Sequence, residues 1–285
     1  MTRKSHLGAI GLDFESKEIH YRLGTTSYIQ PADILPNVRW LSDKIQDIEL
    51  VIFEVDDGPN NLPTPDEITS LINLATISGL TYTVHLPLDL RLASDGTDQH
   101  VSLEKARRVI ERTLPLDPEA YIVHLDGKEI HGHPTRQMME KWTSQACRAL
   151  ETASKWSREF ESLAIENLEG YPPDQLDGVL ARLPVSRCVD IGHLWLDGHD
   201  PAPLLENFLP RTRVIHLHGV NDASSSAPNR SFRDHQSLIH TSPEKLQRVI
   251  DILAIHSFRG VLTLEVFNES DFLTSKEQVI LCQGI

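Results

Sequence analysis

Short runs of apolar, β-prone residues recur along the chain, and longer segments with apolar residues at helical spacing separate them. This alternation is typical of parallel β-α-β units. Several runs, such as Tyr121-Ile122-Val123, are apolar at every position, as expected of strands that are covered on both faces. The pattern predicts strands over residues 23–28, 50–55, 81–87, 120–125, 163–167, 188–192, 214–219 and 261–267.

The segments between these strands have the spacing and the end signals of helices. Thr64-Pro65-Asp66-Glu67 and Thr241-Ser242-Pro243-Glu244 each supply a capping side chain, a first-turn proline and first-turn acids. A closing helix is expected after about Asp271. The other helices are predicted over residues 65–78, 102–113, 135–159, 175–182, 201–208 and 242–256.

Polar residues at the strand ends distinguish a closed barrel from a long open sheet. From the third predicted strand onward, a His, Asp or Glu lies at or just past the C-terminal end of each apolar run. Active sites of α/β barrels are built at that end of the strands. The chain of 285 residues also suits one such domain. We therefore predict a single (β/α)8 barrel over residues 21–285, preceded by an N-terminal arm over residues 1–20.

The strand-end residues predict a metal centre. Their spacing fits one β-α unit each time, so residues distant in sequence should converge in space. Imidazole and carboxylate groups without thiolate suit zinc first, or Mn, Fe or Co, and their number favours two or three ions. His216 and His218 share one face of a strand, and the deeper His216 is preferred as the ligand. The set is His85, His124, Glu166, Asp190, His193, His216 and Glu265.

Charge and composition narrow the range of partners. With 27 basic and 41 acidic residues the net charge is -14, which disfavours a nucleic-acid partner. The three cysteines include no CxxC pair, as expected in a reducing compartment. No window reaches the ~18 apolar residues of a membrane span, and the first residues lack the apolar stretch that a secretory signal needs. We expect a cytoplasmic protein without a membrane partner and leave its oligomeric state open.

The ordered ligand set, with Asn167 after Glu166 and with His235, resembles the xylose isomerase-like TIM barrels over residues 22–268, especially their endonuclease IV branch of metal-dependent phosphodiesterases. The resemblance implies nine side chains around three metal ions, with His235 as a further ligand. Where that branch has Asp-any-His, this chain reads Arg233-Asp234-His235. Either the third site is remodelled, or two ions bind and Arg233 contacts a phosphate.

A narrower resemblance concerns residues 22–29, 33–38 and 48–54, which are similar to the cobamide-remodelling phosphodiesterases of the CbiR type. It implies a small-molecule corrinoid substrate like coenzyme B12, whose nucleotide loop is hydrolysed. Glu166, Glu265 and Arg233 are then the expected catalytic residues, with one glutamate as a possible base for water. The expected substrate contacts are Thr25, Tyr28, Glu54, Trp195 and His218. For two of them another role is open: Trp195 could be buried by packing, and Glu54 could have a purely structural role.

Three other functions stay open. A sugar isomerase or epimerase with one Mn-type ion would use Glu166, Asp190, His216 and Glu265, but it would leave the remaining histidines without a metal role. An endonuclease for abasic sites in DNA is disfavoured by the acidic charge. A non-catalytic corrinoid-binding barrel is the third alternative, and turnover distinguishes it from an enzyme.

Overall fold

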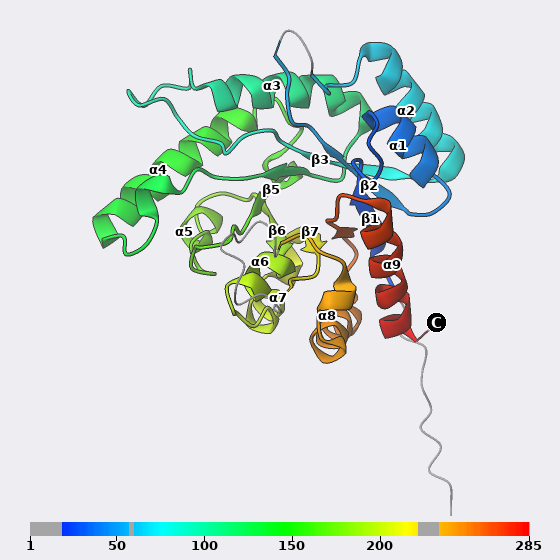
Figure 1. Ribbon diagram of the computed structural model, residues 1–285. Coiled ribbons are helices and arrows are strands. Elements are labelled where there is room, and N and C mark those ends of the chain that lie inside the picture. Colours follow the sequence, from blue (N-terminus) through cyan, green and yellow to red (C-terminus); the bar gives the residue numbers. More distant parts are fainter. Residues whose placement is uncertain (1–18, 57–59, 222–233, 285) are drawn as a thin grey trace, which may run out of the picture.

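The computed structural model describes residues 19–56, 60–221 and 234–284, and residues 1–18 of the expected N-terminal arm lie outside it. Eight parallel strands close into a barrel in chain order, with β8 paired to β1 (Figure 1). This confirms the predicted (β/α)8 barrel. The strands are β1 Arg22–Thr26, β2 Asp47–Val51, β3 Thr81–His85, β4 Tyr121–Val123, β5 Leu163–Glu166, β6 Ser186–Asp190, β7 Thr212–Leu217 and β8 Val261–Leu264.

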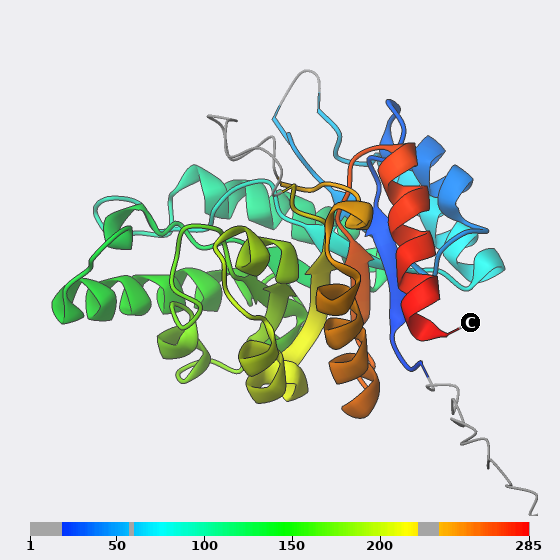
Figure 2. The same ribbon diagram turned by 60° about the horizontal axis from the view of Figure 1, so that its bottom comes forward.

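Helices surround the barrel on the outside (Figure 1). The closing helix α9 lies beside β1, as Figure 2 shows, and its Gln283 side chain donates to the Tyr21 hydroxyl at 2.6 Å. The helices are α1 Ile34–Leu41, α2 Pro65–Ser78, α3 Val101–Thr113, α4 Arg136–Ala153, α5 Asp177–Leu180, α6 Ile191–Leu196, α7 Ala202–Phe208, α8 Pro243–Ile255 and α9 Glu269–Gln283.

The helix starts that carried capping signals form as predicted. Thr64 and Glu67 make a reciprocal capping box at the start of α2, and the Ser242 hydroxyl accepts from the Lys245 backbone at the start of α8. The sequence did not reveal α1 or the six-residue α6. Strand β2 also begins three residues before the predicted start, at Asp47. Its two acids, Asp47 and Glu49, are fully buried, and both precede the predicted strand.

Strand periodicity connects the core to the polar strand ends. A small buried cluster, separate from the large core, contains Ile122, Ala164, Cys188 and Val214. Each of these residues comes two positions before a candidate ligand on the same strand, so both sets face the barrel interior. An apolar layer therefore lies beneath the ligands. Among the residues that the structure describes, no helix is long and apolar enough to cross a membrane.

Candidate metal centre

The C-terminal strand ends bring ten imidazole and carboxylate side chains into three clusters whose ligand atoms lie within 4.8 Å of one another, and a fourth group adds the buried Cys188 thiol to Glu166 and His216. The first and second clusters share Glu166, the last residue of β5. Asp190 ends β6, and the other members come from the ends of β3, β4, β7 and β8, from α6, and from the segment before α8. The first cluster is His85, His124 and Glu166; the second is Glu166, Asp190, His216 and Glu265; the third is His193, His218, Asp234 and His235.

In the first cluster, two imidazoles face one carboxylate oxygen. Glu166 Oε2 lies 3.1 Å from His124 Nε2 and 3.6 Å from His85 Nε2. The opposite nitrogens are held from outside: His85 Nδ1 is 3.0 Å from the Leu86 carbonyl oxygen, and His124 Nδ1 is 3.4 Å from Asp89 Oδ1. When His85 Nδ1 donates to that carbonyl, Nε2 keeps its lone pair for a ligand at the cluster.

The second cluster is buried around the His216 imidazole. Its Nδ1 lies 3.1 Å from Glu265 Oε2, 3.3 Å from Glu166 Oε1 and 3.8 Å from Asp190 Oδ2. Two of these oxygens, Asp190 Oδ2 and Glu265 Oε2, are buried and have no partner in hydrogen-bond geometry. Buried acceptors without donors are costly, and a bound cation would satisfy them. The donor set therefore fits a divalent metal ion.

The third cluster gathers three imidazoles around Asp234. The carboxylate of Asp234 lies 3.7 Å from His193 Nε2, 3.4 Å from His218 Nδ1 and 3.8 Å from His235 Nε2. We expected His218 to contact substrate. Its fully buried imidazole instead belongs to this cluster and also lies 3.3 Å from Asp190 Oδ1. The displaced acid Asp234 thus reaches the position of a ligand, while Arg233 lies outside the described residues.

Gly192 explains the Asp-Ile-Gly-His stretch that links the second and third clusters. The Asp190 side chain caps α6 by accepting from the His193 backbone at 2.6 Å, which aims both residues at the site. A Cβ atom at position 192 would lie 2.0 Å from the His218 ring. Only glycine lets that ring pack against the start of α6. Sequence reasoning used the spacing of Asp190 and His193 but missed this requirement.

The charges of the centre stabilise one another. Burial opposes ionisation of Glu166, but His216 and His124 outweigh it and hold its pKa well below the usual value. His216 and His235 do the same for the pKa of Glu265. Burial also opposes protonation of His124, yet Glu166 and Asp89 raise its pKa to about 10. Protons and metal ions thus compete for the same imidazoles, so metal affinity should fall as the pH falls.

Glu49 of β2 is a member of the site that the sequence reasoning missed. Its side chain is fully buried, and its Oε2 atom lies 2.9 Å from His216 Nε2. The missed signal is the alternation of Asp47, Glu49 and Val51, which places all three residues on one face of the strand. Once β2 is paired with β3, that face is the one that carries His85, the register partner of Val51.

Two of the expected substrate contacts, Tyr28 and Thr25, differ in their exposure. Tyr28 is exposed just past β1 and packs edge to face against exposed Phe53, just past β2, with ring centroids 5.2 Å apart. Thr25 is fully buried, and its hydroxyl donates to the Leu264 carbonyl oxygen at 2.8 Å. That hydroxyl is thus occupied within the barrel wall, whereas Tyr28 is open to a ligand.

Glu54 and Trp195 are also engaged with protein groups. Glu54 binds Lys105 Nζ at 2.7 Å, and this ion pair, together with two backbone donors, lowers the pKa of Glu54 to about 2. Trp195 is buried on α6 and borders a cavity of about 300 Å³ whose other walls include Arg248 and Val249 of α8. These contacts agree with the structural alternative for each residue, and contact of either residue with substrate stays a prediction.

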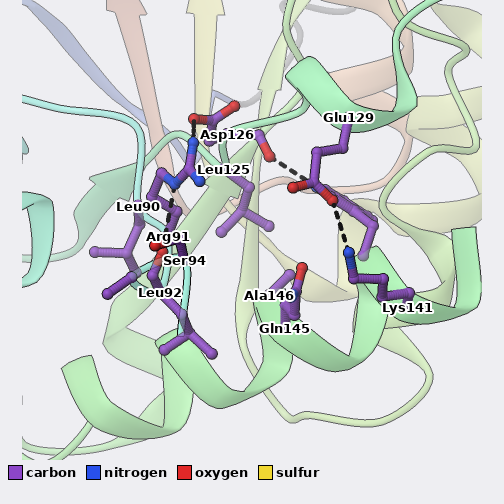
Figure 3. Close-up of a pocket in the computed structure, with 12 residues that line it drawn as sticks. Leu90, Arg91, Leu92, Ser94, Leu125, Asp126, Glu129, Lys141, Gln145 and Ala146 are labelled. Carbon is purple, nitrogen blue, oxygen red and sulfur yellow. Dashed lines mark hydrogen bonds and ion pairs between the residues drawn. The ribbon is translucent and has the colours of Figure 1, made fainter. Parts of the chain in front are cut away.

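A smaller cavity of about 130 Å³ lies between the loops that follow β3 and β4 and helix α4 (Figure 3). Its charged walls are paired: Arg91 binds Asp126 at 2.9 Å, and Lys141 binds Glu129 at 3.4 Å. Asp126 follows His124 by two residues, and its carbonyl oxygen accepts from the indole of Trp142 at 2.8 Å. This wall therefore supports the loop that carries His124.

Residues 43–281 match the model of the xylose isomerase-like TIM barrel family. The chain belongs to this family. No curated protein matches its sequence. Membership agrees with the closed barrel and with the position of the three clusters at the C-terminal strand ends of this xylose isomerase-like barrel.

Solved structures similar to this xylose isomerase-like barrel include both a nuclease and epimerases. Endonuclease IV from Thermus thermophilus has a TM-score of 0.66 and 18% identity, covering 93% of this chain and 100% of that chain. A D-tagatose 3-epimerase-like protein has a TM-score of 0.65 and 19% identity, covering 92% of this chain and 97% of that chain. The 3-keto-D-glucoside 4-epimerase from E. coli has a TM-score of 0.62 and 10% identity, covering 93% of this chain and 100% of that chain. At these identities the likeness shows the fold alone, and the narrower corrinoid resemblance receives no support from it.

Proposed function

We propose that this barrel is a metal-dependent phosphodiesterase that hydrolyses the nucleotide loop of cobamides. The observation that carries the proposal is the contiguity of the three clusters. Glu166 belongs to the first and second clusters, and Asp190 of the second lies 3.4 Å from His193 and 3.3 Å from His218 of the third. One isomerase-type ion would leave the first and third clusters without a role.

The two glutamates of the centre could serve as metal ligands or as the base for water. Divalent ions bound at the clusters would neutralise charge on a phosphodiester and activate water at neutral pH. Glu166 and Glu265 are buried carboxylates that neighbouring imidazoles hold ionised. A strongly acidic carboxyl group is a weak base. Both glutamates therefore suit the role of ligand better than that of the base for water, which we had considered for one of them.

Support for a corrinoid within the phosphodiester class comes from the first two β-α units. The segments that resemble cobamide-remodelling enzymes form β1, α1 and β2 and end near Tyr28 and Phe53. These two exposed aromatic rings offer an apolar edge where β1 and β2 end. The net charge of -14 opposes a nucleic-acid polyanion much more than a small corrinoid.

The deciding experiment is incubation of the metal-loaded protein with coenzyme B12, followed by mass spectrometry. We expect loss of part of the nucleotide loop, with no loss in a Glu166→Gln variant whose fold circular dichroism verifies. Intact cobamide in both samples would refute the hydrolase proposal. Tight binding without cleavage would indicate the corrinoid-binding barrel instead.

An epimerase is the second candidate, because the second cluster by itself offers one imidazole and three carboxylates. This set suits a single hard cation such as Mn. A protein that binds one equivalent of Mn and interconverts D-tagatose with its epimer would support this function. Two or three equivalents of metal, without sugar turnover, would favour the phosphodiesterase.

A further inference from the structure

Glu49 is a buried carboxylate that serves none of the three clusters directly. It lies in the middle of β2 on the inner face of the barrel and is fully buried. Its Oε2 atom lies 2.9 Å from His216 Nε2, and its Oε1 atom is buried without a hydrogen-bond partner. An apolar residue would fill this position at lower cost, because burial of an incompletely paired carboxylate is unfavourable.

The contact determines what His216 can offer to the second cluster. A carboxylate accepts only, so the proton of this hydrogen bond belongs to His216 Nε2. When a metal ion takes the place of the Nδ1 proton, the imidazole presents its Nδ1 lone pair to the second cluster, where Nδ1 lies 3.1 Å from Glu265 and 3.3 Å from Glu166. Carboxylates that bind the far nitrogen of a metal-ligating histidine fix its tautomer and ring orientation.

We propose that Glu49 is a positioning residue that holds His216 with Nδ1 directed at the second cluster. The proposal shares the metal ion with the function proposed above but requires no particular reaction. Metal affinity therefore tests it independently of turnover. An epimerase and a phosphodiesterase would both depend on this contact, since His216 is a ligand in either function.

Asp47 supplies a matched control on the same strand. It lies two residues before Glu49, on the same inner face, and is also fully buried. Its carboxylate accepts from the hydroxyls of Thr81 at 2.7 Å and Thr83 at 3.0 Å instead of from an imidazole. Asp47→Asn and Glu49→Gln therefore each replace one buried carboxylate with its amide, but only the second change alters the support of His216.

The experiment is a titration of the full chain with Co²⁺, read by visible absorption, for the wild type and both variants. We expect Glu49→Gln to weaken Co²⁺ binding by about 10- to 100-fold and to change the ligand-field spectrum. Asp47→Asn should leave the spectrum unchanged and should change the affinity by no more than about twofold, which is much less than the loss expected when the hydrogen-bond partner of a metal-ligating histidine is altered. Melting curves without metal show whether either variant is folded.

Two results would overturn the inference. One is a Glu49→Gln variant with wild-type affinity and spectrum, and the other is an equal loss in Asp47→Asn, which would mark a general effect of replacing a buried acid in β2. If Glu49→Gln does not fold, Glu49→Asp keeps the charge, shortens the side chain and carries the same expectation. Absence of Co²⁺ binding by the wild type would refute the metal centre itself, whereas binding without cobamide cleavage would refute only the proposed reaction.

Discussion

Glu166 is the residue whose replacement should have the largest effect on metal binding. Its Oε2 atom faces His124 and His85, and its Oε1 atom faces His216. A Glu166→Gln change keeps the size of the side chain and removes the charge that the first and second clusters share. We expect this single substitution to weaken two metal sites together and to leave the third site, around Asp234, able to bind.

The size of the effect follows from ligand linkage. At a free metal concentration of 100 times its Kd, each site stabilises the folded chain by ~2.7 kcal/mol, so two sites contribute about 5 kcal/mol. A large domain gains about 2 °C in melting temperature per kcal/mol. The metal-induced rise in melting temperature should therefore be roughly 10 °C smaller in Glu166→Gln than in the wild type.

The assay compares melting temperatures with zinc and with a chelator for each variant, so that effects of the substitution on the metal-free chain cancel. Glu54→Gln is the matched control, because Glu54 is a partly exposed glutamate whose partner is Lys105. That control should keep the full metal-induced rise. An equal rise in wild type and Glu166→Gln, or three equivalents of zinc in the variant by mass spectrometry of the metals, would refute the shared-ligand reasoning.

Four other substitutions test three separate parts of the structure. Gly192→Ala, which forces a Cβ into the His218 ring, and His218→Ala should each lower the bound metal by one equivalent, and unchanged metal content would exclude His218 as a ligand. Burial raises the pKa of Asp47 from 3.8 to about 7, although two hydroxyl donors partly offset it. Between these two pKa values the folded chain keeps a proton on Asp47 that the unfolded chain loses. The free energy of unfolding therefore falls as the pH rises: the contribution of this proton is complete below about pH 4 and is lost as the pH rises through about 7. Asp47→Asn is measured against wild type by urea denaturation of the metal-free chain. Its free energy of unfolding should rise relative to that of wild type between about pH 4 and 7, by at most on the order of 4 kcal/mol. A difference in stability that does not change with pH would contradict the effect of burial. Phe272→Ala removes a fully buried ring of α9 and should cost about 3–5 kcal/mol in urea denaturation, whereas a cost under about 1 kcal/mol would mean that α9 is not docked as described.

The sequence by itself determined the barrel and the strand ends at which most of the candidate ligands lie. Apolar runs at regular intervals define the strands, and a polar residue at the end of a run must lie at the C-terminal edge of a parallel barrel. For this reason His85, His124, Glu166 and Asp190 could be placed at one mouth from their spacing alone, and the structure gathers them within the first and second clusters. Family membership then agrees with the same strand pattern.

Only the tertiary structure decided which polar group meets which. Glu49 lies in a run that reads as the polar approach to a strand, and its partner His216 is 167 residues away. His218 and Asp234 likewise become neighbours where Gly219 pairs with Gln236, while Glu54 forms an ion pair with Lys105 on α3. Periodicity gives the face on which a side chain lies, but closure of the barrel determines the neighbours across it and so the charge each one carries.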